Sequence, residues 1–202
     1  LPAEAAAGVQ AIFSDIDGTL TTDGKLLPST YHALWRWRGA SRRLVLVTGR
    51  PAGWAEAFAR MWPVDAVIAE NGGVLFLPGP RGLRRLYSVP AARLAADRRR
   101  MLAAAREVER RVPGARLSLD SRYTEVDLAI DYNEERRLGP DAAARIEALL
   151  RASGFNAVRS SVHVNYWAGR FDKLTACRRV ARRLGLRPDE IVYVGDSVND
   201  EP

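Results

Sequence analysis

Three short, largely apolar segments constrain the fold of this chain most strongly, because each of them ends in a cluster of polar residues. They cover residues 12–14, 44–47 and 191–194. Segments that are apolar along their length are typical of strands buried on both faces of a parallel sheet. Helix-like stretches at residues 31–38 and 51–61 follow the first two segments. This alternation predicts an α/β fold with a doubly wound, Rossmann-like parallel sheet.

The pattern changes at the loop-rich residues 78–82, Pro-Gly-Pro-Arg-Gly. Beyond this loop, apolar and polar residues alternate in several segments, for example in residues 126–131. Such alternation is typical of an antiparallel sheet with one face exposed to water. We therefore predict a core formed by residues 1–79 and 169–202, with an α+β cap domain inserted at residues 80–168.

The polar residues that follow the three apolar segments lie on loops far apart in the sequence. Asp15, Asp17 and Gly18 follow the first segment, residues 48–50 (Thr-Gly-Arg) follow the second, and residues 195–200 follow the third. In an open parallel sheet, ligands bind beyond the carboxyl ends of the strands. We therefore expect the three loops to form one site.

The two carboxylates of the first loop suit two different chemical roles. Asp15 is placed to point out of the strand end, where a carboxylate acts as a nucleophile and forms an acyl phosphate. Asp17 suits a general acid and base that protonates a leaving alcohol and then activates water. Gly18 allows the bend that brings Asp17 over the reacting oxygen.

Two carboxylates this close repel each other unless a cation lies between them. Asp196, Asn199 and Asp200 add further oxygen ligands from the third loop. An all-oxygen site that also receives a phosphate is typical of Mg²⁺. Zinc does not fit, because the one cysteine and the two histidines lie in different segments of the sequence.

The oxygen atoms of a bound phosphate need hydrogen-bond donors and a positive charge. We expect the Thr48 hydroxyl and nearby backbone amides to be the donors and Lys173 to supply the charge. The sequence has 31 lysine and arginine residues, and only two of them, Lys25 and Lys173, are lysines. A compact ammonium contacts a carboxylate and a phosphate together where a planar guanidinium does not fit. The other candidate phosphate- and substrate-binding residues of the three loops are Gly18, Gly49, Arg50 and Asn199.

Each motif also has a simpler structural interpretation. An Asp-x-Asp after a strand commonly forms a turn and a helix cap, Gly-Asp-Ser-x-Asn-Asp resembles an Asx turn, and Lys173 suits a solvated helix face. The motifs nevertheless occur together and in order, at the ends of predicted parallel strands. That combination favours a catalytic site.

Composition limits the partners and the location of the chain. Its 202 residues, 47% of them hydrophobic, are enough to bury a core. The net charge of +7 is spread over short arginine groups without zinc-finger spacing, so we expect an anionic small molecule and no nucleic acid as the partner. No segment resembles a membrane span or a secretory signal, and Cys177 is the single cysteine. We therefore expect a cytoplasmic protein without a membrane partner.

The four motifs together resemble those of the haloacid dehalogenase superfamily of phosphohydrolases. The matching residues are Asp15, Asp17, Gly18 and Thr19, then Thr48, then Lys173, and finally Gly195, Asp196, Ser197, Asn199 and Asp200. The resemblance implies that Asp15 is the nucleophile and Asp17 the general acid and base. It also implies a Mg²⁺ ion held by Asp15, the carbonyl group of Asp17 and Asp196, with Asp200 nearby. Members usually continue with a further strand and helix, whereas this sequence stops at Pro202, so we expect an uncovered sheet edge.

A cap between the second and third motifs resembles the type IIB subgroup, which includes Cof-like sugar phosphatases, sucrose-phosphate phosphatase, mannosyl-3-phosphoglycerate phosphatase and phosphomannomutase. Asn71, within the Glu-Asn-Gly of residues 70–72, also resembles that subgroup and is a candidate substrate-binding residue. In the cap, Arg159, His163 and Asn165 are candidates for recognising the leaving group. An ordinary cap strand with polar outer positions explains these three residues equally well.

These observations lead us to expect a Mg²⁺-dependent phosphomonoester hydrolase that acts on a small phosphorylated metabolite, such as a sugar or polyol phosphate, through an aspartyl phosphate. A phosphosugar mutase of the same superfamily is an alternative, because it returns the phosphoryl group to its substrate before water attacks. A non-catalytic protein that binds anionic ligands through its arginines is a third interpretation of the sequence.

Overall fold

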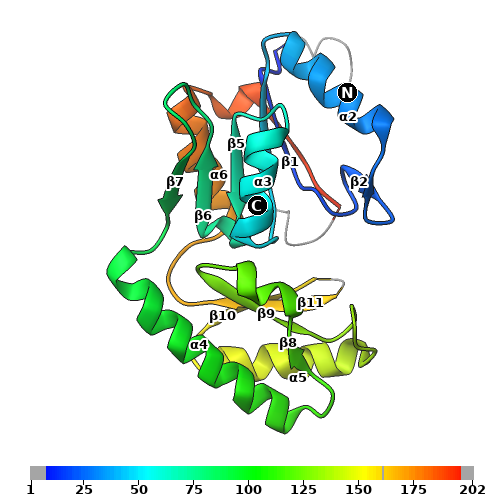
Figure 1. The fold of residues 1–202 in the computed structure, drawn as a ribbon, viewed down its shortest axis with the longest axis vertical. Coiled ribbons are helices and arrows are strands. Elements are labelled where there is room, and N and C mark those ends of the chain that lie inside the picture. Colours follow the sequence, from blue (N-terminus) through cyan, green and yellow to red (C-terminus); the bar gives the residue numbers. More distant parts are fainter. Residues whose placement is uncertain (1–7, 161, 197–202) are drawn as a thin grey trace. The chain divides into compact units, whose positions relative to one another are not determined.

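The computed structural model describes residues 8–160 and 162–196. The chain divides into two compact units (Figure 1). We call Leu1–Ser88 together with Phe171–Pro202 the core unit, and Val89–Arg170 the cap unit. No helix within the described ranges is long and apolar enough to cross a membrane.

The core unit is built on a sheet with the strand order β12-β1-β4-β5-β6-β7. Four strands run parallel, namely β1 (Ala11–Ser14), β4 (Arg43–Val47), β5 (Ala66–Ala69) and β12 (Ile191–Val194). Two more strands are antiparallel, β6 (Val74–Leu77) and β7 (Arg84–Tyr87). The predicted α/β fold with a parallel core sheet is confirmed. β12 lies at one edge of this sheet.

Helices cover both faces of the core sheet. α2 (Pro28–Gly39) packs against β4, and α3 (Ala52–Met61) packs against β5. α6 (Lys173–Leu184) contributes Val180 to an apolar cluster with Val45 and Val47 of β4. Because side chains alternate along a strand, Leu44 and Leu46 point to the opposite face. Figure 1 shows α3 and α6 on opposite sides of the sheet. The remaining core elements are β2 (Thr21–Thr22), β3 (Lys25–Leu26) and the 3₁₀ turns η1 (Glu70–Gly72) and η3 (Pro188–Glu190).

Side-chain and backbone caps fix both ends of α6. The Asp172 carboxylate accepts a hydrogen bond from Thr175 N at 2.6 Å, which satisfies a free amide of the first turn. Gly185 ends the helix with a left-handed φ of 69°. Lys173 is therefore the first residue of a well-capped helix.

The cap unit is an antiparallel sheet with two helices on one side (Figure 1). Its strands, in spatial order, are β10 (Asn156–Arg159), β11 (His163–Trp167), β9 (Asp127–Asp131) and β8 (Arg116–Leu117). The other elements are α4 (Ala91–Arg111), α5 (Gly139–Ala152) and the 3₁₀ turn η2 (Leu119–Tyr123). Leu128, Ile130, Val164 and Tyr166 point toward the helices and form the apolar centre of the unit.

Two details of the predicted organisation differ from the structure. The predicted cap began at residue 80, whereas residues 80–88 belong to the core unit because β7 pairs with β6 along its length. We predicted that one face of the cap sheet is exposed to water. This prediction is wrong for β9, since all five of its residues are buried. Asp131 illustrates the reason, because its carboxylate accepts hydrogen bonds from Glu134 N at 2.8 Å and Glu135 N at 3.0 Å.

Candidate active site

The adjacent strands β1 and β12 direct two acidic residues to the same edge of the core sheet. Ser14 pairs with Val194 in parallel register, and Asp15 N donates to Val194 O at 2.9 Å. Asp15 follows β1 directly, and Asp196 lies two residues beyond the end of β12. The Asp15 side chain is buried, whereas Asp196 is exposed.

Asp15 and Lys173 form an ion pair between residues that are 158 positions apart in the sequence. Lys173 Nζ lies 3.3 Å from Asp15 Oδ1, and the two side chains are only 10% and 9% exposed. Removing two charges from water is costly unless they compensate each other. The ammonium therefore stabilises the ionised Asp15 carboxylate, which is the form that acts as a nucleophile.

The turn after Asp15 is closed by a side chain and a glycine. Thr21 Oγ1 accepts a hydrogen bond from Gly18 N and donates one to Ile16 O, both at 3.2 Å. Gly18 has a φ of 81°, a conformation that L side chains rarely adopt. A Cβ atom at this position would overlap the Asp196 carboxylate. The Asp196 carboxylate thus lies against the turn that carries Asp17.

Asp17 is held by Arg50, which the sequence predicted as a phosphate- or substrate-binding residue. Arg50 Nε donates to Asp17 Oδ2 at 2.9 Å, and Arg50 Nη2 donates to Asp17 Oδ1 at 2.8 Å. The Arg50 guanidinium also lies over the Trp54 ring, 5.3 Å from its centroid. The two parallel hydrogen bonds fix the orientation of the carboxylate, and the ring supports the guanidinium from one side.

Thr48 is buried at the end of β4, where its hydroxyl accepts a hydrogen bond from Arg50 N at 3.0 Å. Its backbone is fixed as well, since Thr48 N donates to Ile68 O at 2.8 Å and Thr48 O accepts from Asn71 N at 3.3 Å. Gly49 lies between Thr48 and Arg50 in the same turn. The predicted second loop and Asn71 are therefore close neighbours.

Glu70 is a candidate site residue whose role we did not predict from the sequence. It is completely buried, and its Oε1 accepts a hydrogen bond from Ala52 N at 2.8 Å. Its own N–H donates to Arg50 O at 3.2 Å. A carboxylate at the first turn of α3 is favourable for the helix dipole. The only signal in the sequence was an acidic residue directly after a buried strand.

Asn71 and Gly72 both adopt left-handed backbone conformations, with φ values of 55° and 100°. A Cβ atom on Gly72 would overlap the backbone carbonyl of Asp172, the N-cap of α6. The tight contact therefore links this turn to the helix that begins with Lys173. The Asn-Gly pair by itself indicates a turn, but this contact depends on packing.

The donor atoms at the strand ends suit a hard cation. Asp15, the carbonyl group of Asp17 and Asp196 offer only oxygen, and Asp196 lies beside the Asp17–Gly18 turn. This donor chemistry fits Mg²⁺. Among residues 8–160 and 162–196, no three histidine, cysteine, aspartate or glutamate side chains cluster as a metal site. Asp200 and Asn199, the other predicted residues of this loop, lie outside the described residues.

The three predicted cap residues do not share one face of the cap sheet. Arg159 pairs in register with Val164, a residue of the helix-facing side, and its Nε lies 2.7 Å from Glu147 Oε2 on α5. His163 and Asn165 occupy the other face. His163 Nε2 lies 3.0 Å from Glu134 Oε2. Asn165 Oδ1 is buried and has no hydrogen-bond partner in the described part of the chain.

Comparisons with known proteins agree on one family. Residues 12–79 match the family described as haloacid dehalogenase-like hydrolase. The phosphoglycolate phosphatase of Halorubrum lacusprofundi is 32% identical over 193 residues, which cover 92% of this chain and 76% of that protein. The phosphoglycolate phosphatase of Archaeoglobus fulgidus is 30% identical over 194 residues, covering 95% of this chain and 77% of that protein.

Solved structures of low sequence identity share the fold. The structure of Thermoplasma acidophilum 0175 has a TM-score of 0.74 at 19% identity, covering 95% of this chain and 79% of that chain. The sucrose-phosphatase from Synechocystis, in complex with sucrose and phosphate, has a TM-score of 0.65 at 18% identity, covering 95% of this chain and 78% of that chain. At these identities the likeness is one of fold, and in each case it covers 95% of this chain.

Proposed function

Since the chain belongs to the haloacid dehalogenase-like hydrolase family, we propose that this phosphatase hydrolyses monoesters of small phosphorylated metabolites through an aspartyl phosphate on Asp15. The observation that carries the proposal is the buried ion pair between Asp15 and Lys173. It keeps a carboxylate ionised at the end of β1, where substrates of open parallel sheets bind.

In the first step, an Asp15 oxygen attacks phosphorus and the bond from phosphorus to the ester oxygen breaks. Asp17, in its protonated form, gives its proton to the leaving alkoxide. In the second step, the Asp17 carboxylate takes a proton from water, and the water oxygen attacks the phosphorus of the aspartyl phosphate. Inorganic phosphate leaves and Asp15 is regenerated.

Three groups of the core unit are assigned to the phosphoryl oxygens. The Thr48 hydroxyl and the Gly49 amide donate hydrogen bonds, and the Lys173 ammonium offsets negative charge in the transition state. We assign Mg²⁺ to Asp15, the Asp17 carbonyl group and Asp196, with Asp200 as a further ligand. When bound, the ion supplies additional positive charge for the phosphoryl oxygens.

The substrate class in our proposal is wider than the sugar or polyol phosphates expected from the sequence. Relatives at 30% and 32% identity are named for phosphoglycolate, so a short phosphorylated acid belongs in the class as well. We assign recognition of the leaving group to the cap unit, and Asn165 is its best candidate because its buried Oδ1 lacks a hydrogen-bond donor in the described chain.

The decisive experiment measures phosphate release from a panel of phosphoglycolate, hexose phosphates and polyol phosphates, with Mg²⁺ and with a chelator. Asp15→Asn is expected to lower the rate by about 10³-fold or more, because the amide is not a nucleophile. Asp23→Asn is the matched control, since Asp23 is an exposed turn residue of the same segment. Unchanged metal-dependent release by Asp15→Asn would refute the mechanism.

The same panel tests the two alternative functions. A mutase would convert one phosphosugar isomer into another without matching release of inorganic phosphate, so mass balance distinguishes it from a hydrolase. A non-catalytic binding protein would bind panel members in calorimetry without turning any of them over.

A further inference from the structure

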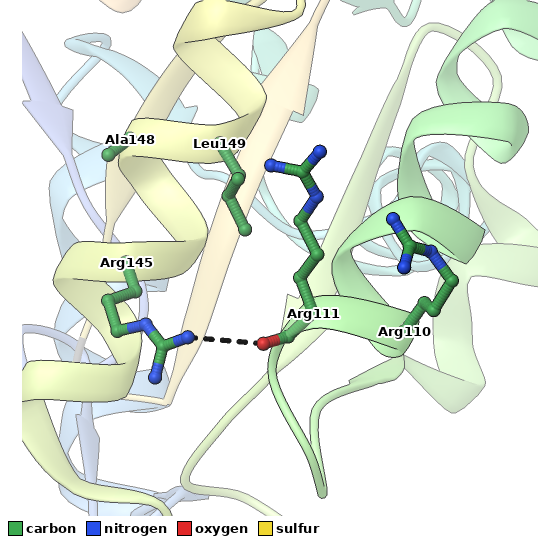
Figure 2. A pocket seen from close by; sticks show the side chains of 5 residues that line it. All are labelled: Arg110, Arg111, Arg145, Ala148 and Leu149. Atoms are coloured by element: carbon green, nitrogen blue, oxygen red, sulfur yellow. Dashed lines mark hydrogen bonds between the residues drawn. The ribbon is translucent and has the colours of Figure 1, made fainter.

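An open pocket of about 590 Å³ lies within the cap unit, between the end of α4 and the middle of α5 (Figure 2). Its lining residues are Arg110, Arg111, Arg145, Ala148 and Leu149. All five belong to the cap unit, and none belongs to the motifs assigned to phosphate hydrolysis. The pocket is also built on the helices, whereas His163 and Asn165 occupy the helix-free face of the cap sheet.

Arg145 is held at the pocket by the end of the neighbouring helix. Its Nη2 donates to Arg111 O at 3.1 Å, as Figure 2 shows. This carbonyl belongs to the last turn of α4, where carbonyl groups have no partner within the helix. In the described part of the chain, Arg145 forms no ion pair with a carboxylate. Its charge is therefore uncompensated, and most of its N–H donors remain available to a ligand.

Arg110 and Arg111 share one carboxylate. Glu107 Oε1 and Oε2 accept hydrogen bonds from Arg110 Nη2 at 2.7 Å and from Arg110 Nε at 3.0 Å, respectively, and Arg111 Nε also donates to Oε1. The hydrogen bonds from Arg110 and then Arg111 lower the pKa of Glu107 to about 2, so this carboxylate is ionised at neutral pH. Three guanidinium groups and one carboxylate leave an excess of two positive charges around the pocket.

We propose that this pocket binds a small anion that carries at least two negative charges on clustered oxygen atoms. A guanidinium presents planar pairs of N–H donors that match the oxygens of a phosphate or a carboxylate, and the two uncompensated charges match a dianion. Ala148 and Leu149 form an apolar part of the wall, which accommodates a short carbon chain. Phosphate esters and polycarboxylates share this chemistry.

The test uses the full chain carrying Asp15→Asn, so that no probe is turned over, with inorganic pyrophosphate and citrate as separate probes. Nuclear magnetic resonance follows the arginine Nε–H signals, assigned by comparing single variants, and calorimetry measures affinity. Arg111→Gln/Arg145→Gln removes two pocket charges. Arg99→Gln/Arg136→Gln is the matched control, because both of these arginines are exposed cap residues outside the pocket and their loss changes the net charge equally.

We expect saturable shifts of the Arg111 and Arg145 signals, and a loss of about tenfold or more in affinity in the pocket variant, with little change in the control. If the arginine signals shift with pyrophosphate alone, the site is assigned to phosphate ligands. If they shift with citrate alone, it is assigned to carboxylate ligands. Equal weakening in both double variants would show diffuse attraction to a cationic chain and would overturn the proposal. Unshifted Arg145 signals at saturating probe concentrations would overturn it as well.

A conservative variant, Arg145→Lys, distinguishes a loss of binding from a loss of folding. Arg145→Lys keeps the positive charge but loses the planar fork, and we expect it to weaken binding while the thermal unfolding of the protein stays the same. Full retention of affinity in Arg145→Lys would contradict the role of the guanidinium geometry.

Discussion

Arg50 donates two hydrogen bonds, of 2.9 and 2.8 Å, to the Asp17 carboxylate. The Arg50 guanidinium also lies over the Trp54 ring. Both carboxylate oxygens of Asp17 therefore act as hydrogen-bond acceptors, and in the proposed mechanism the same carboxylate takes a proton from water. In the proposed acid step this carboxyl group carries a proton, and a protonated carboxyl group no longer accepts both hydrogen bonds from Arg50. We propose that the positive charge of Arg50 also attracts the anionic substrate to this edge of the sheet.

Replacing Arg50 tests this relationship. Arg50→Gln is expected to lower kcat by about tenfold or more, because Asp17 loses the group that orients it, and to raise KM, because a positive charge near the substrate is lost. Arg43→Gln is the matched control, since Arg43 pairs with Asp65 at 2.9 Å on the same unit. Steady-state kinetics on the best panel substrate provide both constants, and equal behaviour of the two variants would contradict the assignment.

Gly18→Ala is expected to abolish most phosphate release, because the new Cβ would collide with the Asp196 carboxylate. Gly24→Ala separates this collision from backbone strain. Gly24 also has a left-handed φ, 70° compared with 81° at Gly18, but no atom lies within 4 Å of the position that its added Cβ would occupy.

Both alanine variants should therefore lose about 1 kcal/mol of unfolding free energy from the backbone conformation, and only Gly18→Ala should lose activity. Urea unfolding and phosphate-release assays measure the two effects. Equal activity of the two variants would argue against a role of the Gly18–Asp196 contact.

Gly72→Ala is expected to disturb the beginning of α6, since its Cβ would overlap the Asp172 carbonyl. We expect the resulting shift to separate Lys173 from Asp15 and to lower activity. Gly82→Ala is the matched control, because Gly82 has the same φ of 100° and open space around the added atom. We expect Gly72→Ala to be less stable than Gly82→Ala by about 2 kcal/mol in urea unfolding. Similar stability of the two variants would disprove the tight contact.

Tyr166 predicts an alkaline limit of stability. Its hydroxyl donates to Met101 O at 2.9 Å inside the cap, and burial, reinforced by the Asp127 carboxylate, raises the pKa of the phenol above its usual value of 10.0. The unfolded chain releases this proton near its usual pKa while the folded chain retains it. The stabilising contribution is therefore complete below pH 10 and declines above it, by up to about 1.4 kcal/mol per pH unit.

Tyr166→Phe should lower the unfolding free energy at pH 7 by about 1 kcal/mol, because the hydrogen bond is lost, and should flatten the decline above pH 10. Tyr123→Phe, at a tyrosine that is 51% exposed, is the control. Urea unfolding at pH 7 and at pH 10.5 measures both effects. An alkaline decline as steep in Tyr166→Phe as in the unmodified chain would contradict the assignment.

Local patterns were sufficient for the architecture of the core and for the position of its polar loops. Buried parallel strands need continuous apolar side chains, so the segments around Phe13, Val45 and Val192 were recognisable as buried strands of a parallel sheet. Parallel strands also end at the same edge, which is why the residues after β1, β4 and β12 were expected to meet. The resemblance to the haloacid dehalogenase superfamily, drawn from the motifs at those ends, is confirmed.

The partners of individual side chains depended on packing between segments that are distant in the sequence. Arg50 forms an ion pair with Asp17, and Arg159 forms one with Glu147, and no local pattern in the sequence indicated either partner. The position of Arg159 follows from strand register, because a shift of one residue moves a side chain to the other face of a sheet. Periodicity along one segment carries no information about register with another, so only the assembled sheets place these charges.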